Sequence, residues 1–170
     1  SQQNQINRAN TYYQIFVKKF PTPESMSKSS LKTILKMWSG LGYNIRAKRI
    51  YESSKILAEK GFEEIYPNFE LLPGVGQYTK NAILSFAYGD KVLAVDTNLE
   101  RIITRYFGVD NAKDYVRKYS NLLLEDINSK DLNQAFMDFG SSICTSSKTK
   151  CDICPLEKSC KKYFINSKNS

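Results

Sequence analysis

Four cysteines, Cys144, Cys151, Cys154 and Cys160, lie within 17 residues, and the sequence has no histidine and no other cysteine. Their spacing, C-x6-C-x2-C-x5-C, lets four thiolates converge without help from another segment. Disulfides suit small secreted scaffolds, but the preceding 143 residues suffice for a hydrophobic core and show no signal peptide. Structural zinc usually takes two paired units, and only one Cys-x2-Cys pair occurs. The spacing therefore favours a [4Fe–4S] cluster over zinc or oxidised thiols, in a reducing cytoplasm.

The composition indicates the class of partner. The 170 residues include 25 Lys and Arg against 17 Asp and Glu, which gives a net charge of +8 and an isoelectric point near 9.2. This balance favours a polyanionic partner such as nucleic acid. A basic surface that is exposed only to water would give the same net charge. No apolar run is long enough to span a membrane, so we expect no membrane insertion.

Apolar residues recur at helical spacing along nearly the whole chain, which predicts an all-α protein. The first helix should stop at Pro21-Thr22-Pro23 and the third at Gly61, because proline and glycine are common at helix ends. Val92–Val95 is the only β-branched apolar run, and its four residues favour a buried connector over a strand. The polar stretch 161–170 should fray. Helices are expected over about 6–20, 30–38, 44–60, 77–88, 99–107, 113–126 and 132–142, with a short one before Leu72.

A tight turn at Leu72-Pro73-Gly74-Val75-Gly76 is a candidate anion site. Two glycines two positions apart let neighbouring backbone N–H groups point outward at the start of a helix, and such a nest binds a phosphate oxygen without a side chain. Lys80, one turn into that helix, can add positive charge. An ordinary turn between two helices would show the same glycines, so both interpretations stay open.

Asp96 follows the buried run and stands at or just before a predicted helix, with Asn98 two residues later. An aspartate there is commonly a helix N-cap. The functional alternative is a carboxylate at the mouth of a cleft that stabilises a developing cation. Arg101 and Arg105 are expected to be surface or helix-pairing residues in either case.

Three motifs occur in a fixed order: LPGVGxxT at 72–79, VDxNxxR at 95–101, and the cysteine loop. Together they resemble the helix-hairpin-helix DNA glycosylases with an iron–sulfur cluster, over about residues 1–162. Within that superfamily the likeness is greater to the adenine DNA glycosylase (MutY) family than to endonuclease III. It rests on WSGLGY at 38–43, QQNQ at 2–5, and the MDFG, CT and CPL motifs around the cysteines.

The resemblance implies two α-helical subdomains with a DNA-binding cleft between them. A six-helix-barrel subdomain containing the hairpin would span residues 1–91, and a cluster subdomain residues 92–170. Asp96 would lie where the two meet. The implied cofactor is one [4Fe–4S] cluster, held by the four cysteines.

Tyr78 is the position that discriminates within the superfamily. Endonuclease III-type enzymes carry a lysine there, whose amine attacks the sugar and leads to strand cleavage. A tyrosine has no such amine, so the resemblance implies a monofunctional glycosylase that leaves an abasic site. Alternatively, Tyr78 packs within the hairpin.

The resemblance also assigns roles around the reacting sugar. Asp96 would stabilise the oxocarbenium ion, while Asn98 and Tyr78 would orient the reacting groups. Tyr43 and Gln3 would wedge into the base stack beside the flipped base. Further positions expected at the DNA are Asn4, Gly74, Val75, Gly76, Lys80, Lys148 and Lys150. Tyr43 could instead pack in the core, and the lysines of the cysteine loop could be merely solvated.

Two departures from the family pattern bear on activity. The glutamate that serves as general acid in MutY would precede Ser1, and Asn4 replaces the threonine of QQTQ. We therefore expect a piece of a longer protein, without its N-terminal helix and its 8-oxoguanine-reading domain. The predicted function is excision of adenine opposite guanine or 8-oxoguanine, by a monomer acting on mismatched or damaged double-stranded DNA. The alternatives are a thymine or uracil mismatch glycosylase, or a non-catalytic DNA-binding module.

Overall fold

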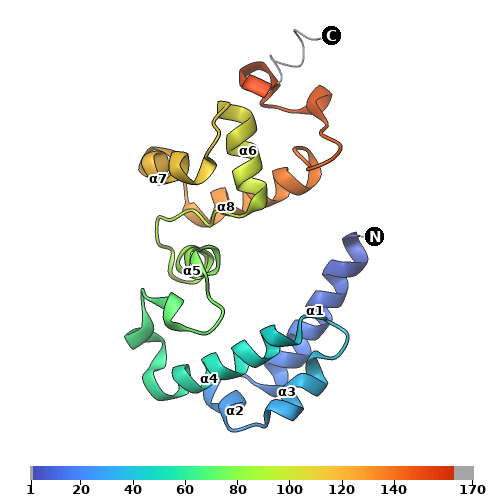
Figure 1. Cartoon of the computed structure of the whole chain (residues 1–170), viewed down its shortest axis with the longest axis vertical. Coiled ribbons are helices and arrows are strands. Elements are labelled where there is room, and N and C mark those ends of the chain that lie inside the picture. Colours follow the sequence, from blue (N-terminus) through green and yellow to red (C-terminus); the bar gives the residue numbers. More distant parts are fainter. Residues whose placement is uncertain (1, 163–170) are drawn as a thin grey trace. The chain divides into compact units, whose positions relative to one another are not determined.

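The computed structural model describes the backbone of residues 2–162 and the side chains of residues 10–162, and every regular element in this range is helical (Figure 1). The predicted all-α class is therefore confirmed. The chain forms two compact units, Ser1–Gly76 and Gln77–Ser170. The subdomain boundary near residue 91 stays a prediction. No helix in the described part of the chain is long and apolar enough to cross a membrane.

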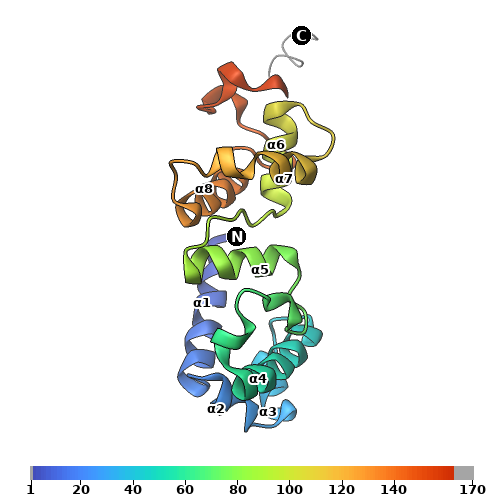
Figure 2. The ribbon, with the colours of Figure 1, turned by 90° about the vertical axis from the view of Figure 1, so that its left-hand side faces the viewer.

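In the first unit, α4 packs against α2 and α3 (Figures 1 and 2). Phe20, Ile34 and Ala47 form the buried core of this unit, and Phe16 and Trp38, whose rings meet edge to face, pack against it. Burial of each large apolar side chain contributes about 1.5–3 kcal/mol to the stability of the folded state. The elements of this unit are α1 (Gln2–Lys19), α2 (Pro23–Ser27), α3 (Leu31–Trp38), α4 (Asn44–Ile65) and the 3₁₀ turn η1 (Phe69–Leu71).

At two predicted helix ends the chain forms further helical turns that were not predicted from the sequence. The sequence Pro21-Thr22-Pro23 does end α1, but it also starts the unpredicted helix α2, because Thr22 forms a capping box with Ser25 and Pro23 occupies the first turn. Gly61, at φ 78°, breaks the helical geometry of α4 as expected, yet helical turns resume beyond it as far as Ile65. In both places a local signal that ends one helix also allows the next helical turns to begin.

In the second unit, α6 packs on both α7 and α8. Its core consists of Leu93, Leu99, Ile103, Ala112, Val116 and Leu124. The elements are α5 (Gln77–Ile83), the π-helical turn η2 (Leu84–Tyr88), α6 (Thr97–Phe107), α7 (Ala112–Leu123), α8 (Ser129–Ser142) and the 3₁₀ turns η3 (Cys151–Ile153) and η4 (Glu157–Ser159). Val92–Val95 is a non-helical connector, as predicted. Of the stretch expected to fray, residues 163–170 lie outside the described part.

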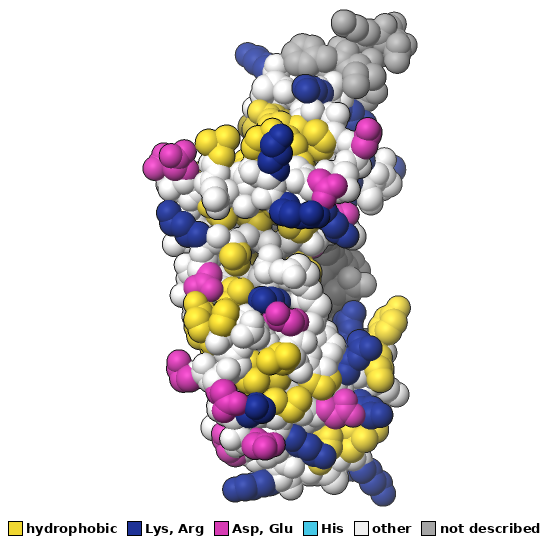
Figure 3. Space-filling model, turned by 60° about the vertical axis from the view of Figure 1, so that its left-hand side comes forward, with side chains coloured by type: hydrophobic (Ala, Val, Ile, Leu, Met, Phe, Trp, Pro, Cys, Tyr) yellow, Lys and Arg dark blue, Asp and Glu magenta, His cyan; other side chains and the backbone are white. Residues whose placement is uncertain are grey.

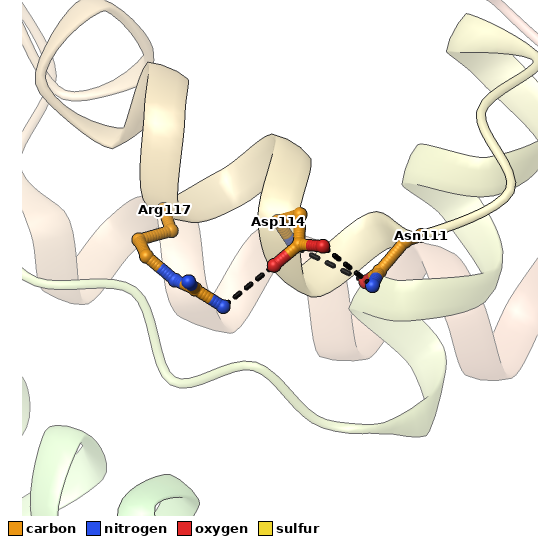
Figure 4. A network of polar contacts seen from close by, with 3 residues as sticks. All are labelled: Asn111, Asp114 and Arg117. Atoms are coloured by element: carbon orange, nitrogen blue, oxygen red, sulfur yellow. Dashed lines mark hydrogen bonds and ion pairs between the residues drawn. The ribbon is translucent and has the colours of Figure 1, made fainter.

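The start of α7 shows how short-range polar contacts fix a helix end (Figure 4). Asn111 accepts a hydrogen bond from the backbone N–H of Asp114 at 3.1 Å and donates to its carboxylate at 2.7 Å. Arg117, one turn later, forms an ion pair with the same carboxylate at 2.6 Å. Both partners of that pair are exposed, so it contributes at most about 1 kcal/mol.

Candidate active site and cysteine centre

Asp96 is the N-cap of α6 (Thr97–Phe107) and has an extended backbone. Its Oδ1 accepts a hydrogen bond from the Leu99 N–H at 2.8 Å, and its Oδ2 accepts one from the Asn98 side-chain amide at 2.9 Å. The N-cap interpretation is therefore confirmed. It does not exclude the functional one, because each carboxylate oxygen has two lone pairs and uses only one in these bonds.

Arg101 holds Asn98 in the orientation that these bonds require. Its guanidinium donates to Asn98 Oδ1 at 2.7 Å, which turns the Asn98 NH₂ group toward Asp96. The same guanidinium donates to the carbonyls of Gly140 at 2.8 Å and Cys144 at 2.9 Å. Arg101 is thus a helix-pairing residue, one of the two roles expected, and it also links the α6 N-terminus to the cysteine loop.

Gly140 permits this close approach of α8 (Ser129–Ser142) to α6. A Cβ atom added at Gly140 would lie 2.6 Å from the Cβ of Asn98, closer than real Cβ contacts come. In the sequence this glycine belongs to the MDFG motif, which gives no indication of the contact with Asn98. Its structural role is to let the Asn98 side chain pass directly over the helix backbone.

The four cysteines are free thiols that line one cavity of about 40 Å³. Apolar side chains, among them Ile102, Phe139 and Ile143, complete its wall. In the described residues, no three side chains of the metal-binding types come close enough to hold a metal ion. Four thiols facing one cavity are a donor set that suits iron–sulfur clusters or zinc. The structure thus gathers the predicted ligands without bringing them to coordination distance.

Arg105 of α6 contributes polar contacts around these thiols. The Arg105 guanidinium donates to the Thr145 carbonyl at 2.7 Å and lies 3.5 Å from Cys144 Sγ, while the Cys160 thiol donates to the Arg105 carbonyl at 3.6 Å. Burial raises the pKa of the Cys154 thiol, and the negative charge of neighbouring thiolates raises it further. Arg105 therefore does not pair two helices; its contacts join α6 to both ends of the cysteine loop.

Lys148 and Lys150 are exposed on the cysteine loop. The loop itself is ordered by local bonds: the Thr145 hydroxyl donates to the Lys148 carbonyl at 2.6 Å, and the Lys150 N–H donates to the Ile143 carbonyl at 3.1 Å. Exposure agrees with phosphate contact and with simple solvation, so the role of these lysines stays a prediction.

Tyr43 does not pack in the core, so that alternative is wrong. Its side chain is 76% exposed, and its backbone has the left-handed values φ 49° and ψ 59°. No other non-glycine residue in the described range has a positive φ. The preceding turn is fixed because the Trp38 indole donates to the Gly42 carbonyl at 2.7 Å. An aromatic ring held outward on a strained turn is available for a partner.

The turn at residues 72–76 is tight, and its backbone lies close to a neighbouring side chain. Gly74 has φ 82°, and a Cβ added there would collide with the side chain of Arg49. The Val75 N–H donates to the Leu72 carbonyl at 3.1 Å, which closes the turn. A Cβ at Gly76, in contrast, would meet open space. Gly74 is therefore required by the fold, while the phosphate nest stays a prediction.

Tyr78 and Lys80 lie on α5, in the second unit. Tyr78 is 42% exposed and lines a cavity of about 590 Å³ with apolar residues of the connector and of α7 (Ala112–Leu123). Lys80 is half-buried. The side chains of Gln3 and Asn4 lie outside the described residues.

The charged surface offers no single large basic patch on the face drawn in Figure 3, where Lys and Arg side chains alternate with acidic and apolar ones.

The chain is similar in sequence to known DNA repair proteins. Residues 1–126 match the family described as HhH-GPD superfamily base excision DNA repair protein. A curated relative named adenine DNA glycosylase, from Buchnera aphidicola subsp. Baizongia pistaciae, is 40% identical over 97% of this chain and 49% of its own length. The chain thus spans about half the length of that relative.

Two solved structures resemble the chain along most of its length. A thermostable thymine-DNA glycosylase has a TM-score of 0.82 and 30% identity, covering 91% of this chain and 76% of that one. A trapped endonuclease III–DNA covalent intermediate has a TM-score of 0.75 and 25% identity, covering 93% of this chain and 77% of that one.

Proposed function

Because the chain belongs to the HhH-GPD superfamily of base excision DNA repair proteins, we propose that its full-length protein removes a mispaired base from double-stranded DNA by hydrolysing the N-glycosidic bond. The observation that carries this proposal is the Asp96 carboxylate at the start of α6. It is held by Leu99 and Asn98 and retains a free lone pair on each oxygen.

A fixed carboxylate is suited to glycosidic chemistry. As the base departs, positive charge develops on the sugar, and a negative group that needs no reorganisation stabilises that charge more than water does. Asn98 fixes one carboxylate oxygen and is itself fixed by Arg101, so this chain supplies the required rigidity. Asn98 and Tyr78 are proposed to orient the sugar and the attacking water.

The proposed DNA contacts are of two kinds: some position the protein on the DNA backbone, and one distorts the base stack. Lys148, Lys150 and the turn at Gly74 would bind phosphates, which place a protein on DNA without reading its sequence. Tyr43 would enter the base stack and fill the space of the flipped base, a role supported by its exposed ring. The remaining proposed contacts with the strands are Gln3, Asn4, Val75, Gly76 and Lys80.

The target base is proposed from similarity. Adenine opposite guanine or 8-oxoguanine is the first choice, because the 40% identical relative is named adenine DNA glycosylase. Thymine or uracil mispaired with guanine is the second, because the structure with a TM-score of 0.82 is a thymine-DNA glycosylase. Incubation of the full-length protein with duplexes containing each mismatch, followed by chromatography of released bases, separates the two.

The reaction should leave the DNA strand intact. Tyr78 has no amine to form a Schiff base with the opened sugar, so the full-length protein should release free base, with strand breakage only after alkali or heat. The measurement is gel electrophoresis of an end-labelled duplex with and without alkali. A covalent protein–DNA complex trapped by borohydride would contradict this expectation, and the absence of any released base would favour the non-catalytic binding module.

We further propose that Cys144, Cys151, Cys154 and Cys160 hold one [4Fe–4S] cluster. The cluster would organise the loop for DNA contact, while the residues of α6 act on the sugar. Protein purified anaerobically should be yellow-brown and contain about four irons per chain with broad absorption near 400 nm. Stoichiometric zinc without iron would contradict the assignment.

A single cysteine replacement tests the same point. Cys151→Ser should reduce iron retention, because a serine hydroxyl is a poorer ligand for iron–sulfur clusters than a thiolate. Lys158→Ser, on the same loop but without a sulfur, is the matched control and should leave the iron content unchanged. The measurement is iron analysis of both variants after identical anaerobic purification.

Binding to duplex DNA should weaken steeply with salt, because most proposed contacts are to phosphates. Lys148→Glu combined with Lys150→Glu should weaken binding to matched and mismatched duplexes alike, and should lower the slope of log affinity against log salt by about 1–2. Titrations at several salt concentrations measure both effects. Lys32→Glu combined with Lys36→Glu, on α3 (Leu31–Trp38), makes the same change of net charge at exposed positions and serves as the control. An affinity independent of salt would count against a DNA partner.

A further inference from the structure

The connector Val92–Val95 leads directly into Asp96 without regular secondary structure. Leu93 and Ala94 are buried in it. A buried segment outside helices and sheets must find hydrogen-bond partners for its backbone groups elsewhere, since unsatisfied groups are costly. The hydrogen bonds to the backbone of this connector therefore determine how rigidly Asp96, the residue before α6, is positioned.

Asn133 supplies two of those partners from α8 (Ser129–Ser142). Its Oδ1 accepts a hydrogen bond from the Ala94 N–H at 2.9 Å, and its Nδ2 donates to the Val92 carbonyl at 3.0 Å. One side-chain amide thus binds both ends of the same stretch of backbone. Asn133 is 2% exposed, so water does not compete with these bonds.

The second amide hydrogen of Asn133 is also used. It donates to Ser85 Oγ at 2.9 Å; Ser85 donates to Ser129 Oγ at 3.2 Å, and Ser129 donates to the Asp90 carbonyl at 2.7 Å. Within the described residues, no buried side-chain nitrogen or oxygen lacks a partner. A fully satisfied buried network is rigid, because any displacement leaves a desolvated group unpaired.

The middle of the connector is held from its other side by Asn81, whose amide donates to the Leu93 carbonyl at 2.8 Å. Two asparagines on different helices therefore hold three consecutive connector residues. Neither asparagine contacts Asp96 itself, and both act only through the backbone that leads to it.

We propose that Asn133 is a positioning residue for Asp96. It fixes Ala94, two residues before the carboxylate, against α8, and so sets where the α6 N-cap lies relative to the sugar. A displacement of about 1 Å in a reacting group costs on the order of 10²-fold in rate, so a connector with looser attachment would weaken the charge stabilisation. This inference rests on the proposed glycosylase function.

The test compares two duplexes that differ only in charge at the reacting sugar. One carries a cationic pyrrolidine abasic-site analogue, which resembles the developing cation, and the other a neutral tetrahydrofuran analogue. The full-length protein should prefer the cation because of Asp96, and Asp96→Asn should abolish that preference. Asn133→Leu should reduce the preference about tenfold or more, while affinity for the neutral analogue changes by less than about threefold.

Leu124→Ala is the matched control, because it removes buried apolar volume from the same unit without removing any hydrogen bond to the connector. It should lower stability while leaving the preference for the cation within about twofold. Asn81→Leu is the second variant, for the case that Asn133→Leu does not fold. It removes the bond to the Leu93 carbonyl at a half-buried position and should shift the preference in the same direction.

The outcomes separate the two proposals. If the unmutated protein prefers the cation and the folded asparagine variants keep that preference, the positioning role is overturned and the proposed function stands. If the unmutated protein shows no preference, both are overturned. Loss of preference in the Leu124→Ala control as well would reduce Asn133 to a general stability role and would also overturn the inference.

Discussion

Replacement of Asp96 by asparagine should slow base excision on the order of 10³-fold, equivalent to about 4 kcal/mol of transition-state stabilisation. The fold should survive, because asparagine is as good an N-cap as aspartate and can still accept the Leu99 N–H bond. Affinity for undamaged duplex should stay nearly the same. The variant loses the negative charge that faces the developing cation, and its Nδ2 group cannot accept the hydrogen bond that the Asn98 amide donates to Oδ2 of Asp96. Single-turnover rates together with binding titrations measure the combined effect.

The control is Asp114→Asn in the first turn of α7 (Figure 4). This variant makes the same change of charge in another helical first turn of the same unit, at an exposed position. Its excision rate should match that of the unmutated protein within about twofold. A loss of less than about tenfold for Asp96→Asn would show that the carboxylate is a helix cap and nothing more.

The second large effect is expected at Arg101. Arg101→Leu should lower the free energy of unfolding by about 2–4 kcal/mol, because it leaves the Asn98, Gly140 and Cys144 oxygens without their shared donor. Arg101→Lys should recover little of this loss, since a single ammonium group cannot reproduce the fork of guanidinium donors. Urea unfolding followed by circular dichroism measures each difference.

Arg117→Leu provides the comparison for Arg101. Arg117 also lies on a helix of the second unit, but its side chain is 79% exposed and makes one exposed ion pair. Its loss should cost no more than about 0.5–1 kcal/mol. Equal costs for the two arginines would mean that the bonds of Arg101 to α8 and the cysteine loop are not maintained in solution.

Much of the candidate site was set by short-range chemistry, and that part was predictable from the sequence. The aspartate before a helical pattern predicted the N-cap of α6, the glycines predicted the turn at Gly74, and the cysteine spacing predicted one shared centre. Each of these signals acts over a few residues, because a cap, a positive φ and a compact ligand loop depend only on neighbouring backbone. The helical segments that were not predicted from the sequence, α2 and the turns after Gly61, follow local signals that end one helix and also allow another to begin.

Only the tertiary structure shows which groups Arg101 and Asn133 contact and that Tyr43 is exposed. Arg101 meets the Cys144 carbonyl 43 positions away, and Asn133 meets the Ala94 N–H 39 positions away. Such contacts exist only once α6 packs on α8, which the missing side chain of Gly140 permits at the Asn98 contact. The sequence shows an arginine, an asparagine and a tyrosine, but it does not show their partners. Their partners depend on helix packing, because hydrogen bonds form only between groups that the fold has already brought within about 3 Å.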